Sequence, residues 1–181
     1  MPSGSGWTPG AGWGANSSSG GACRKVSASV VLPEAVVTSV LGTTVDDMLA
    51  YGRVANLGAL LSGQLGAQAH YANGLAAIYI ATGQDAACVA ESAVGFTRME
   101  QRESGLFCSV TMPSILVGTV GGGTGLPAQS ACLALMGLTG EGNGAALAEV
   151  TAATCLCGEI SIVAAMASGT FTGAHEKLAR L

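Results

Sequence analysis

The chain has 181 residues, the usual size of one domain, and a formal net charge of −4. Its few basic residues are scattered, which argues against nucleic acids and anionic membrane surfaces as main partners. Charged residues make up only 10% of the chain, against roughly 25% in a typical soluble domain. We therefore expect a large apolar face, buried by another subunit or by further parts of the same protein.

The cysteine pattern does not indicate a metal site. None of the six cysteines forms a Cys-x-x-Cys pair, and neither of the two histidines completes a zinc-binding spacing. We expect small buried thiols in a reducing compartment and no metal. The most apolar stretch, 160–166, is too short to span a bilayer, and the N-terminus lacks the pattern of a signal peptide, so we expect no membrane span.

Two regions differ in composition. Residues 1–22 are rich in Gly and Ser and predict a disordered leader, and residues 23–181 predict one α+β domain. In chain order, strands are expected over 25–32, 96–102, 106–112 and 114–117. Helices are expected over 34–41, 45–61, 67–81, 85–93, 127–136, 145–167 and 170–181. The helix over 145–167 is apolar on all sides and is expected at the centre of the fold.

A few polar residues are candidates for chemistry. His70 and Asn73 share one helix face, although a histidine on an Ala-rich helix is more often structural. His175 lies in a polar segment near the C-terminus, where it is equally open to a structural interpretation. Asp85 follows Gly83 and opens a helix, so a simple N-cap is the competing interpretation.

The sharpest local feature is the Gly-rich loop at residues 118–124. Consecutive glycines let a backbone turn freely and approach a ligand closely, and the helix that follows could face a phosphate. The loop matches neither the Walker pattern nor a dinucleotide fingerprint, and a plain loop is the alternative. Its residues are Gly118, Thr119, Val120, Gly121, Gly122, Gly123 and Thr124.

Four segments taken together resemble one known family. Residues 77–87 resemble the segment that carries the catalytic Asp of class I 3-hydroxy-3-methylglutaryl-CoA (HMG-CoA) reductases, and residues 108–124, 129–133 and 158–161 resemble further motifs of that family. Their order and spacing agree from about residue 24 to residue 181. The resemblance implies the C-terminal portion of the large substrate-binding domain, built round a long central helix and without the inserted small cofactor domain.

The resemblance also implies a reaction and roles. The family reduces HMG-CoA to mevalonate, a precursor of isoprenoids and sterols, with two NADPH. Asp85 matches the catalytic Asp, and His175 matches the histidine that protonates the departing CoA thiolate, for which an imidazolium is a suitable acid. The other implied positions are His70, Asn73 and Ile162 for the substrate, and Gly118–Thr124 with Arg180 for the cofactor.

The sequence departs from the family at important positions. The motif that holds the catalytic Lys is replaced by residues 7–13, which contain neither Lys nor an acid, and a second substrate-binding Lys is replaced by Ala55. The catalytic Glu and the cofactor domain would lie upstream, and Leu181 stands where the family has a regulatory serine. Losing one transition-state donor costs on the order of 10²–10³ in rate, so we expect negligible activity from this chain alone.

Two functional hypotheses remain. The chain is either a fragment of an HMG-CoA reductase, or a non-catalytic module that binds CoA or NADPH or pairs with a full-length subunit. The leader at 1–22 favours the first, and Ala55 favours the second because it lies inside the well-matched region. Under either hypothesis the resemblance implies a homo-oligomer on the cytosolic side, associated with the endoplasmic reticulum through an anchor outside this chain.

Overall fold

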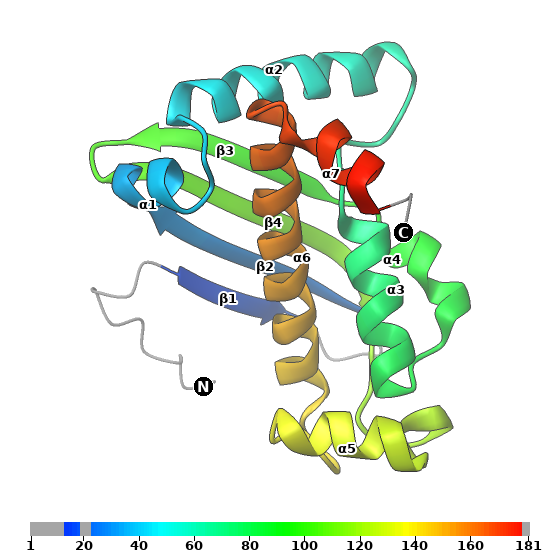
Figure 1. Ribbon diagram of the computed structural model, residues 1–181. Coiled ribbons are helices and arrows are strands. Elements are labelled where there is room, and N and C mark those ends of the chain that lie inside the picture. The colour runs from blue at the N-terminus through cyan, green and yellow to red at the C-terminus, as the bar shows by residue number, and fades with distance from the viewer. Residues whose placement is uncertain (1–12, 19–22, 179–181) are drawn as a thin grey trace.

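A four-stranded antiparallel sheet and a long helix that crosses it form the centre of the protein (Figure 1). The computed structural model describes residues 13–18 and 23–178. The strands lie in the order β1-β2-β4-β3. Their bounds are β1 Trp13–Ser18, β2 Cys23–Leu32, β3 Phe96–Arg102 and β4 Gly105–Leu116.

The alternation of side chains along the strands decides which face of the sheet is buried. On β4, Leu106, Cys108, Val110 and Met112 are buried, while the residues between them are half-buried. The register pairs Met112 with Val26 and carries the same face across to β2. Since successive side chains of a strand point to opposite faces, this places one apolar face against the helices.

The long helix α6, Gly144–Ala167, lies across the sheet and contacts three of its strands together with α2 and α3. It is apolar on all sides, and ten of its residues are buried, as expected for a helix at the centre of a fold. Its length and an 18-residue window of mean hydropathy 1.7 would also suit a membrane span. The apolar segment is therefore longer than the stretch 160–166 suggested, and its packing against sheet and helices accounts for its apolarity.

The remaining helices surround α6 on one side of the sheet (Figure 1). A Thr44 side chain that accepts a hydrogen bond from the Asp47 amide caps α2, as the sequence indicated. Chain order places α7 at the C-terminal end of α6. The bounds are α1 Glu34–Ser39, α2 Val45–Leu61, α3 Tyr71–Thr82, η1 Ala86–Cys88, α4 Val89–Ser92, η2 Gly122–Gly125, α5 Pro127–Leu135 and α7 Thr170–Leu178.

The structure differs from the sequence-based expectations at several places; for example, the helix expected over 85–93 is divided into η1 and α4. Residues 13–18, which fall in the expected leader, form β1 and pair with β2. Residues 114–117 do not form a separate third strand, because β4 continues to Leu116. The third helix begins at Tyr71 rather than at residue 67, because the backbone amide of His70 is bonded to a side chain of α6 and the preceding turn contains Gly66 at φ +89°.

The cysteines are less uniformly buried than expected. Cys108 and Cys155 are buried in the core, and burial raises the pKa of each thiol to about 12. Cys23 and Cys157 are exposed. The interpretation as small buried hydrophobes therefore holds for the first two residues and is wrong for the last two.

Candidate functional site

Asp85 lies where α3 ends and the short helix η1 begins. Gly83 closes α3 in a left-handed conformation, φ 71°, which is the usual C-cap role of glycine. Asp85 then caps η1, because its Oδ1 accepts a hydrogen bond from the Ala87 amide at 2.9 Å. Asp85 is exposed and only one of its carboxylate oxygens is used in this cap. The other oxygen is therefore accessible to a ligand.

Gln84, next to Asp85, joins this segment to the Gly-rich loop. Its amide nitrogen donates to the Gly118 carbonyl at 3.0 Å, and its amide oxygen accepts from the Gly118 backbone nitrogen at 2.8 Å. The side-chain amide of Gln84 therefore bonds both the N–H and the C=O of Gly118. This two-point contact sets the start of the loop relative to Asp85.

A second contact holds the two segments together farther along the loop. A Cβ at Gly83 would overlap the Gly123 backbone, and a Cβ at Gly123 would come within 3.0 Å of the Gly83 carbonyl oxygen. The two backbones therefore touch, and only glycine fits at Gly83. In contrast, a Cβ at Gly121 or Gly125 would meet nothing within 4 Å. The outer part of the loop is therefore open to a ligand, while its inner part is packed against the end of α3.

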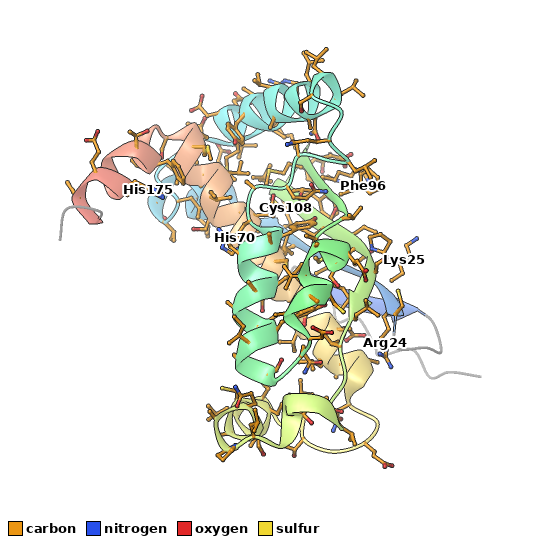
Figure 2. All side chains as sticks on the ribbon, turned by 90° about the vertical axis from the view of Figure 1, so that its right-hand side faces the viewer. Arg24, Lys25, His70, Phe96, Cys108 and His175 are labelled. Carbon is orange, nitrogen blue, oxygen red and sulfur yellow. The ribbon has the colours of Figure 1, made fainter. Side chains whose placement is uncertain are left out.

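His70 lies at the opposite end of α3, beside α6 (Figure 2). Its backbone amide donates to Glu159 Oε1 at 2.5 Å. Its ring nitrogen Nδ1 is buried and has no hydrogen-bond partner among the described residues. A Cβ at Gly158 would overlap the imidazole ring. The imidazole ring of His70 is therefore packed against the backbone of α6 at Gly158, where no side chain intervenes.

Glu159 is the one carboxylate in the described core, with 1% of its surface exposed. Its Oε2 lies 3.2 Å from the Thr97 hydroxyl, which also lies 3.0 Å from the hydroxyl of Tyr71. A threonine hydroxyl has one proton, so Thr97 donates to Glu159 and Tyr71 donates to Thr97. Burial raises the pKa of Glu159, opposed by hydrogen bonds from the His70 amide, Thr97 and the Ala69 amide. Burial also raises the pKa of Tyr71.

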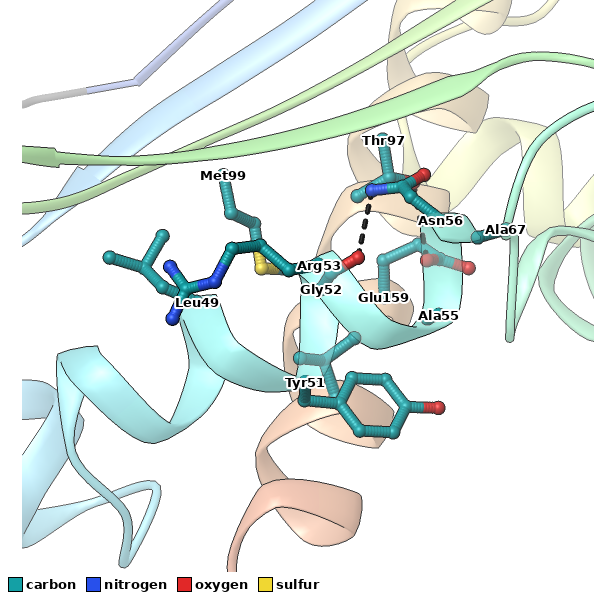
Figure 3. A pocket seen from close by; sticks show the side chains of 11 residues that line it. Leu49, Tyr51, Gly52, Arg53, Ala55, Asn56, Ala67, Thr97, Met99 and Glu159 are labelled. Atoms are coloured by element: carbon teal, nitrogen blue, oxygen red, sulfur yellow. Dashed lines mark hydrogen bonds between the residues drawn. The ribbon is translucent and has the colours of Figure 1, made fainter. Parts of the chain in front are cut away.

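A pocket of about 140 Å³ opens beside Glu159, between α2, β3 and α6 (Figure 3). Tyr51, Arg53, Asn56 and Thr97 supply its other polar side chains. Ala55 also lines it, and this is the position where the resemblance expects a substrate-binding Lys. A cation at residue 55 would therefore stand at the rim of a pocket that contains a carboxylate.

The other residues singled out from the sequence are dispersed. Asn73 is exposed on α3, one turn from His70, and Ile162 packs against the core from α6. His175 is exposed on α7, where its ring stacks on Phe171 with centroids 4.2 Å apart. Because α7 follows the end of α6 near which α3 begins, His175 is not brought to Asp85, which lies beyond the far end of α3 (Figure 1). Arg180 lies outside the described residues.

The residues that organise these contacts were not singled out by the sequence. Glu159 appeared within the segment 158–161 that resembles a family motif, without a role of its own, and its isolation as a charge on an apolar helix was the available signal of a buried, bonded carboxylate. Gln84 appeared only as a member of the segment 77–87, also without a role of its own. Among the described residues, no group of three or more His, Cys, Asp or Glu side chains could hold a metal ion.

Comparison with known proteins explains the motifs. The family model of hydroxymethylglutaryl-coenzyme A reductase matches residues 14–180. The 3-hydroxy-3-methylglutaryl-coenzyme A reductase of Methanothermobacter thermautotrophicus is 40% identical over 158 residues, which are 87% of this chain and 40% of that protein. That of Aeropyrum pernix is 45% identical over 163 residues, 87% of this chain and 39% of the relative.

Reductase 2 of Dictyostelium discoideum is 44% identical over 164 residues, 85% of this chain and 31% of the relative. The chain thus spans about 40% or less of the length of these relatives. With a family match over residues 14–180 and this level of identity, the chain belongs to the hydroxymethylglutaryl-coenzyme A reductase family.

Proposed function

We propose that this chain supplies the C-terminal part of an oxidoreductase active site that reduces HMG-CoA to mevalonate. The observation that carries the proposal is the family match over residues 14–180. It is supported by the packing of the Asp85 segment against the loop at 118–124, where Gln84 bonds both backbone groups of Gly118. The carboxylate and the open glycine backbone are thereby kept side by side.

In this proposal the two ends of α3 contact different parts of the substrate, and the end at Asp85 also lies beside the cofactor loop. Asp85 acts near the reacting carbonyl, and the loop from Gly118 to Thr124, with Arg180, contacts NADPH, which supplies the hydride when bound. The open space at Gly121 and Gly125 fits the close approach of a ligand to backbone amides. At the other end, His70 and Asn73, with Ile162, line the substrate pocket, and His175 protonates the CoA thiolate.

We expect the isolated chain to bind HMG-CoA but to reduce it very slowly. Ala55 removes one cation from the pocket beside Glu159, and the structure leaves His175 far from Asp85 along α3. Stabilising the developing oxyanion is usually the largest catalytic contribution, so a site without its lysines should be very slow. The purified chain should form no measurable mevalonate from HMG-CoA and NADPH. Measurable NADPH-dependent mevalonate formation by the purified chain would contradict this expectation.

Titration calorimetry with HMG-CoA tests the binding part of the proposal. Wild-type chain should bind HMG-CoA, and Asn73→Ala should weaken binding by about fivefold, the effect of losing one hydrogen bond of about 1 kcal/mol. Gln101→Ala changes another exposed amide, on β3, and should leave binding unchanged. Absence of HMG-CoA binding at millimolar concentration, or equal effects of both variants, would refute the assignment.

A second candidate function is a non-catalytic module that pairs with a complete reductase subunit. Ala55 favours it, because the substitution lies inside the matched region and lines the pocket. The transcript upstream of the first codon separates the two proposals. An in-frame motif with the catalytic Lys, together with the cofactor domain, would support the reductase fragment and exclude the separate module.

A further inference from the structure

Two consecutive residues of α6, Gly158 and Glu159, contact His70 from two directions. Glu159 Oε1 accepts the hydrogen bond of the His70 backbone amide. Gly158 lies under the ring, so close that a Cβ there would overlap three ring atoms. Gly74 of α3 lies on another side, where a Cβ would come to 3.3 Å from Nδ1. The backbone of His70 is thus bonded and its ring is enclosed by helix backbone.

Glu159 is itself held from several elements. Thr97 of β3 donates to its second oxygen, and the hydroxyl of Tyr71, the first residue of α3, continues the chain of hydrogen bonds. The carboxylate therefore joins α6, β3 and the start of α3. A fully bonded buried network of this kind has little freedom to rearrange, so it gives a fixed reference for His70.

The surroundings of the ring decide where its proton resides. Nδ1 is buried and has no partner in the described part of the chain, whereas Nε2 is not among the buried unsatisfied atoms. A neutral imidazole has one N–H and one lone pair. Burying an N–H without an acceptor is rarer than burying an acceptor that lacks a donor. The proton therefore belongs on Nε2, the nitrogen that can still reach water or a ligand.

We propose that Gly158 and Glu159 are positioning residues that hold His70 as a hydrogen-bond donor through Nε2–H. The acceptor would be an oxygen of the acyl-CoA substrate, and this last part rests on the proposed function. Gly158 sets the orientation and tautomer of the ring, and Glu159 sets the position of the backbone. Neither residue touches the substrate in this proposal; both act through His70.

Long-range ¹H–¹⁵N NMR of the full ¹⁵N-labelled chain at pH 8 tests the tautomer. We expect His70 to show an imine-type Nδ1 and a protonated Nε2, and the exposed His175 to serve as an internal reference. Gly158→Ala should displace the ring and abolish the single-tautomer pattern. Gly58→Ala is the matched control, because it also adds a methyl group to a helix, at a position with nothing within 4 Å. A wild-type His70 protonated at Nδ1, or averaged between tautomers, would overturn the proposal.

Glu159→Gln tests the backbone contact separately, and does so even if Gly158→Ala fails to fold. It keeps the shape of the side chain but makes the hydrogen bond to the His70 amide neutral and weaker. The His70 amide should then exchange with solvent about tenfold faster, with the tautomer retained. Glu141→Gln, at an exposed loop position, should change neither. Unchanged exchange in Glu159→Gln would remove Glu159 from the proposal.

Addition of HMG-CoA separates this inference from the proposed function. A shift of the Nε2–H resonance that is absent in Gly158→Ala would support the donor role. The predicted tautomer without any response to HMG-CoA would refute the donor role and the proposed substrate while leaving the positioning intact. A response to HMG-CoA from a His70 protonated at Nδ1 would support the substrate and refute the positioning.

Discussion

Among single residues, Glu159 shows how strongly a buried position changes the chemistry of a side chain. It has 1% exposure, and its carboxylate has no cation within ion-pairing distance among the described residues. Its hydrogen bonds come instead from neutral donors, Thr97 and the amides of Ala69 and His70. These donors favour the charged form, but burial opposes it more strongly, so the pKa is raised.

The raised pKa of Glu159 predicts how stability depends on pH. Between the unfolded pKa, 4.5, and the higher folded pKa, the folded chain binds more protons than the unfolded chain. Stability from this group is therefore complete below pH 4.5 and is lost as the pH rises through the folded pKa. Urea unfolding from pH 4 to pH 8 should show this loss in wild type and a smaller one in Glu159→Gln.

The titratable groups facing Glu159 are Tyr71, Cys155 and His70. Tyr71 and Cys155 have raised pKa values and stay neutral over this range, so their contribution is constant. His70→Gln, compared with the wild type, isolates the contribution of the histidine. A Glu159→Gln curve parallel to that of the wild type would show that Glu159 does not titrate differently in the folded chain.

At the scale of elements, the contact between the end of α3 and the Gly-rich loop places the strictest requirement on residue type. Gly83 combines φ +71° with a neighbour that leaves no room for a Cβ. Gly83→Ala should therefore lower the free energy of unfolding by about 2–4 kcal/mol. Roughly 1 kcal/mol of this comes from the left-handed conformation of alanine, and the rest from the separation of the two backbones. Urea denaturation measures this loss.

Gly137 provides the matched control for Gly83. It follows α5 with a similar φ of +69°, but a Cβ there would meet nothing within 4 Å. Gly137→Ala should therefore lose only about 1 kcal/mol. Equal losses in the two variants would mean that the loop moves away without cost and that the packing of Gly83 against Gly123 is unimportant.

Gln84 couples these elements in a way that a separate variant can test. Gln84→Leu removes both hydrogen bonds to Gly118 and leaves that amide and carbonyl without their partner. The expected loss is about 2–3 kcal/mol, since unsatisfied half-buried backbone groups are costly. Exchange of the Gly118 amide, followed by NMR, should accelerate more than that of amides in β2. Unchanged protection of Gly118 would show that the loop is held by other contacts.

For the whole molecule, exposed apolar surface is concentrated on α2. Leu57, Leu60 and Leu61 are 57%, 75% and 79% exposed, and their spacing places them on one side of the helix. Val54 extends the same surface at 71% exposure. A monomeric protein rarely leaves such a surface in water, which supports the proposal of a homo-oligomer.

Sedimentation velocity tests this proposal for the α2 surface. The wild-type chain should self-associate, and Leu60→Glu with Leu61→Glu should shift it toward monomer by at least tenfold in dissociation constant, because each buried leucine contributes about 1.5–3 kcal/mol. Leu135→Glu changes an 88% exposed leucine on α5 and serves as the comparison. A monomeric wild type, or an equal effect of Leu135→Glu, would argue against the α2 surface.

Most of the helices and strands, and the family, could be predicted from the amino-acid sequence. Val45–Leu61 as a helix, the hairpin around residues 103–105 and the long apolar helix follow from local periodicity, caps and turns. The motif around Asp85 and the loop at 118–124 can likewise be recognised from residues that are adjacent in the sequence. Such signals lie within a few positions along the chain, so they can be recognised without knowledge of the structure.

Which of these residues contact one another could not be predicted from the sequence, because it depends on how the elements pack. Gln84 reaches Gly118 across 34 positions, and His70 reaches Glu159 across 89. Such pairings arise when α3 packs on α6 and α6 packs on the sheet, and no local pattern encodes them. The start of α3 at Tyr71 is one consequence, because the amide that would extend the helix backward is bonded to a carboxylate from a distant helix.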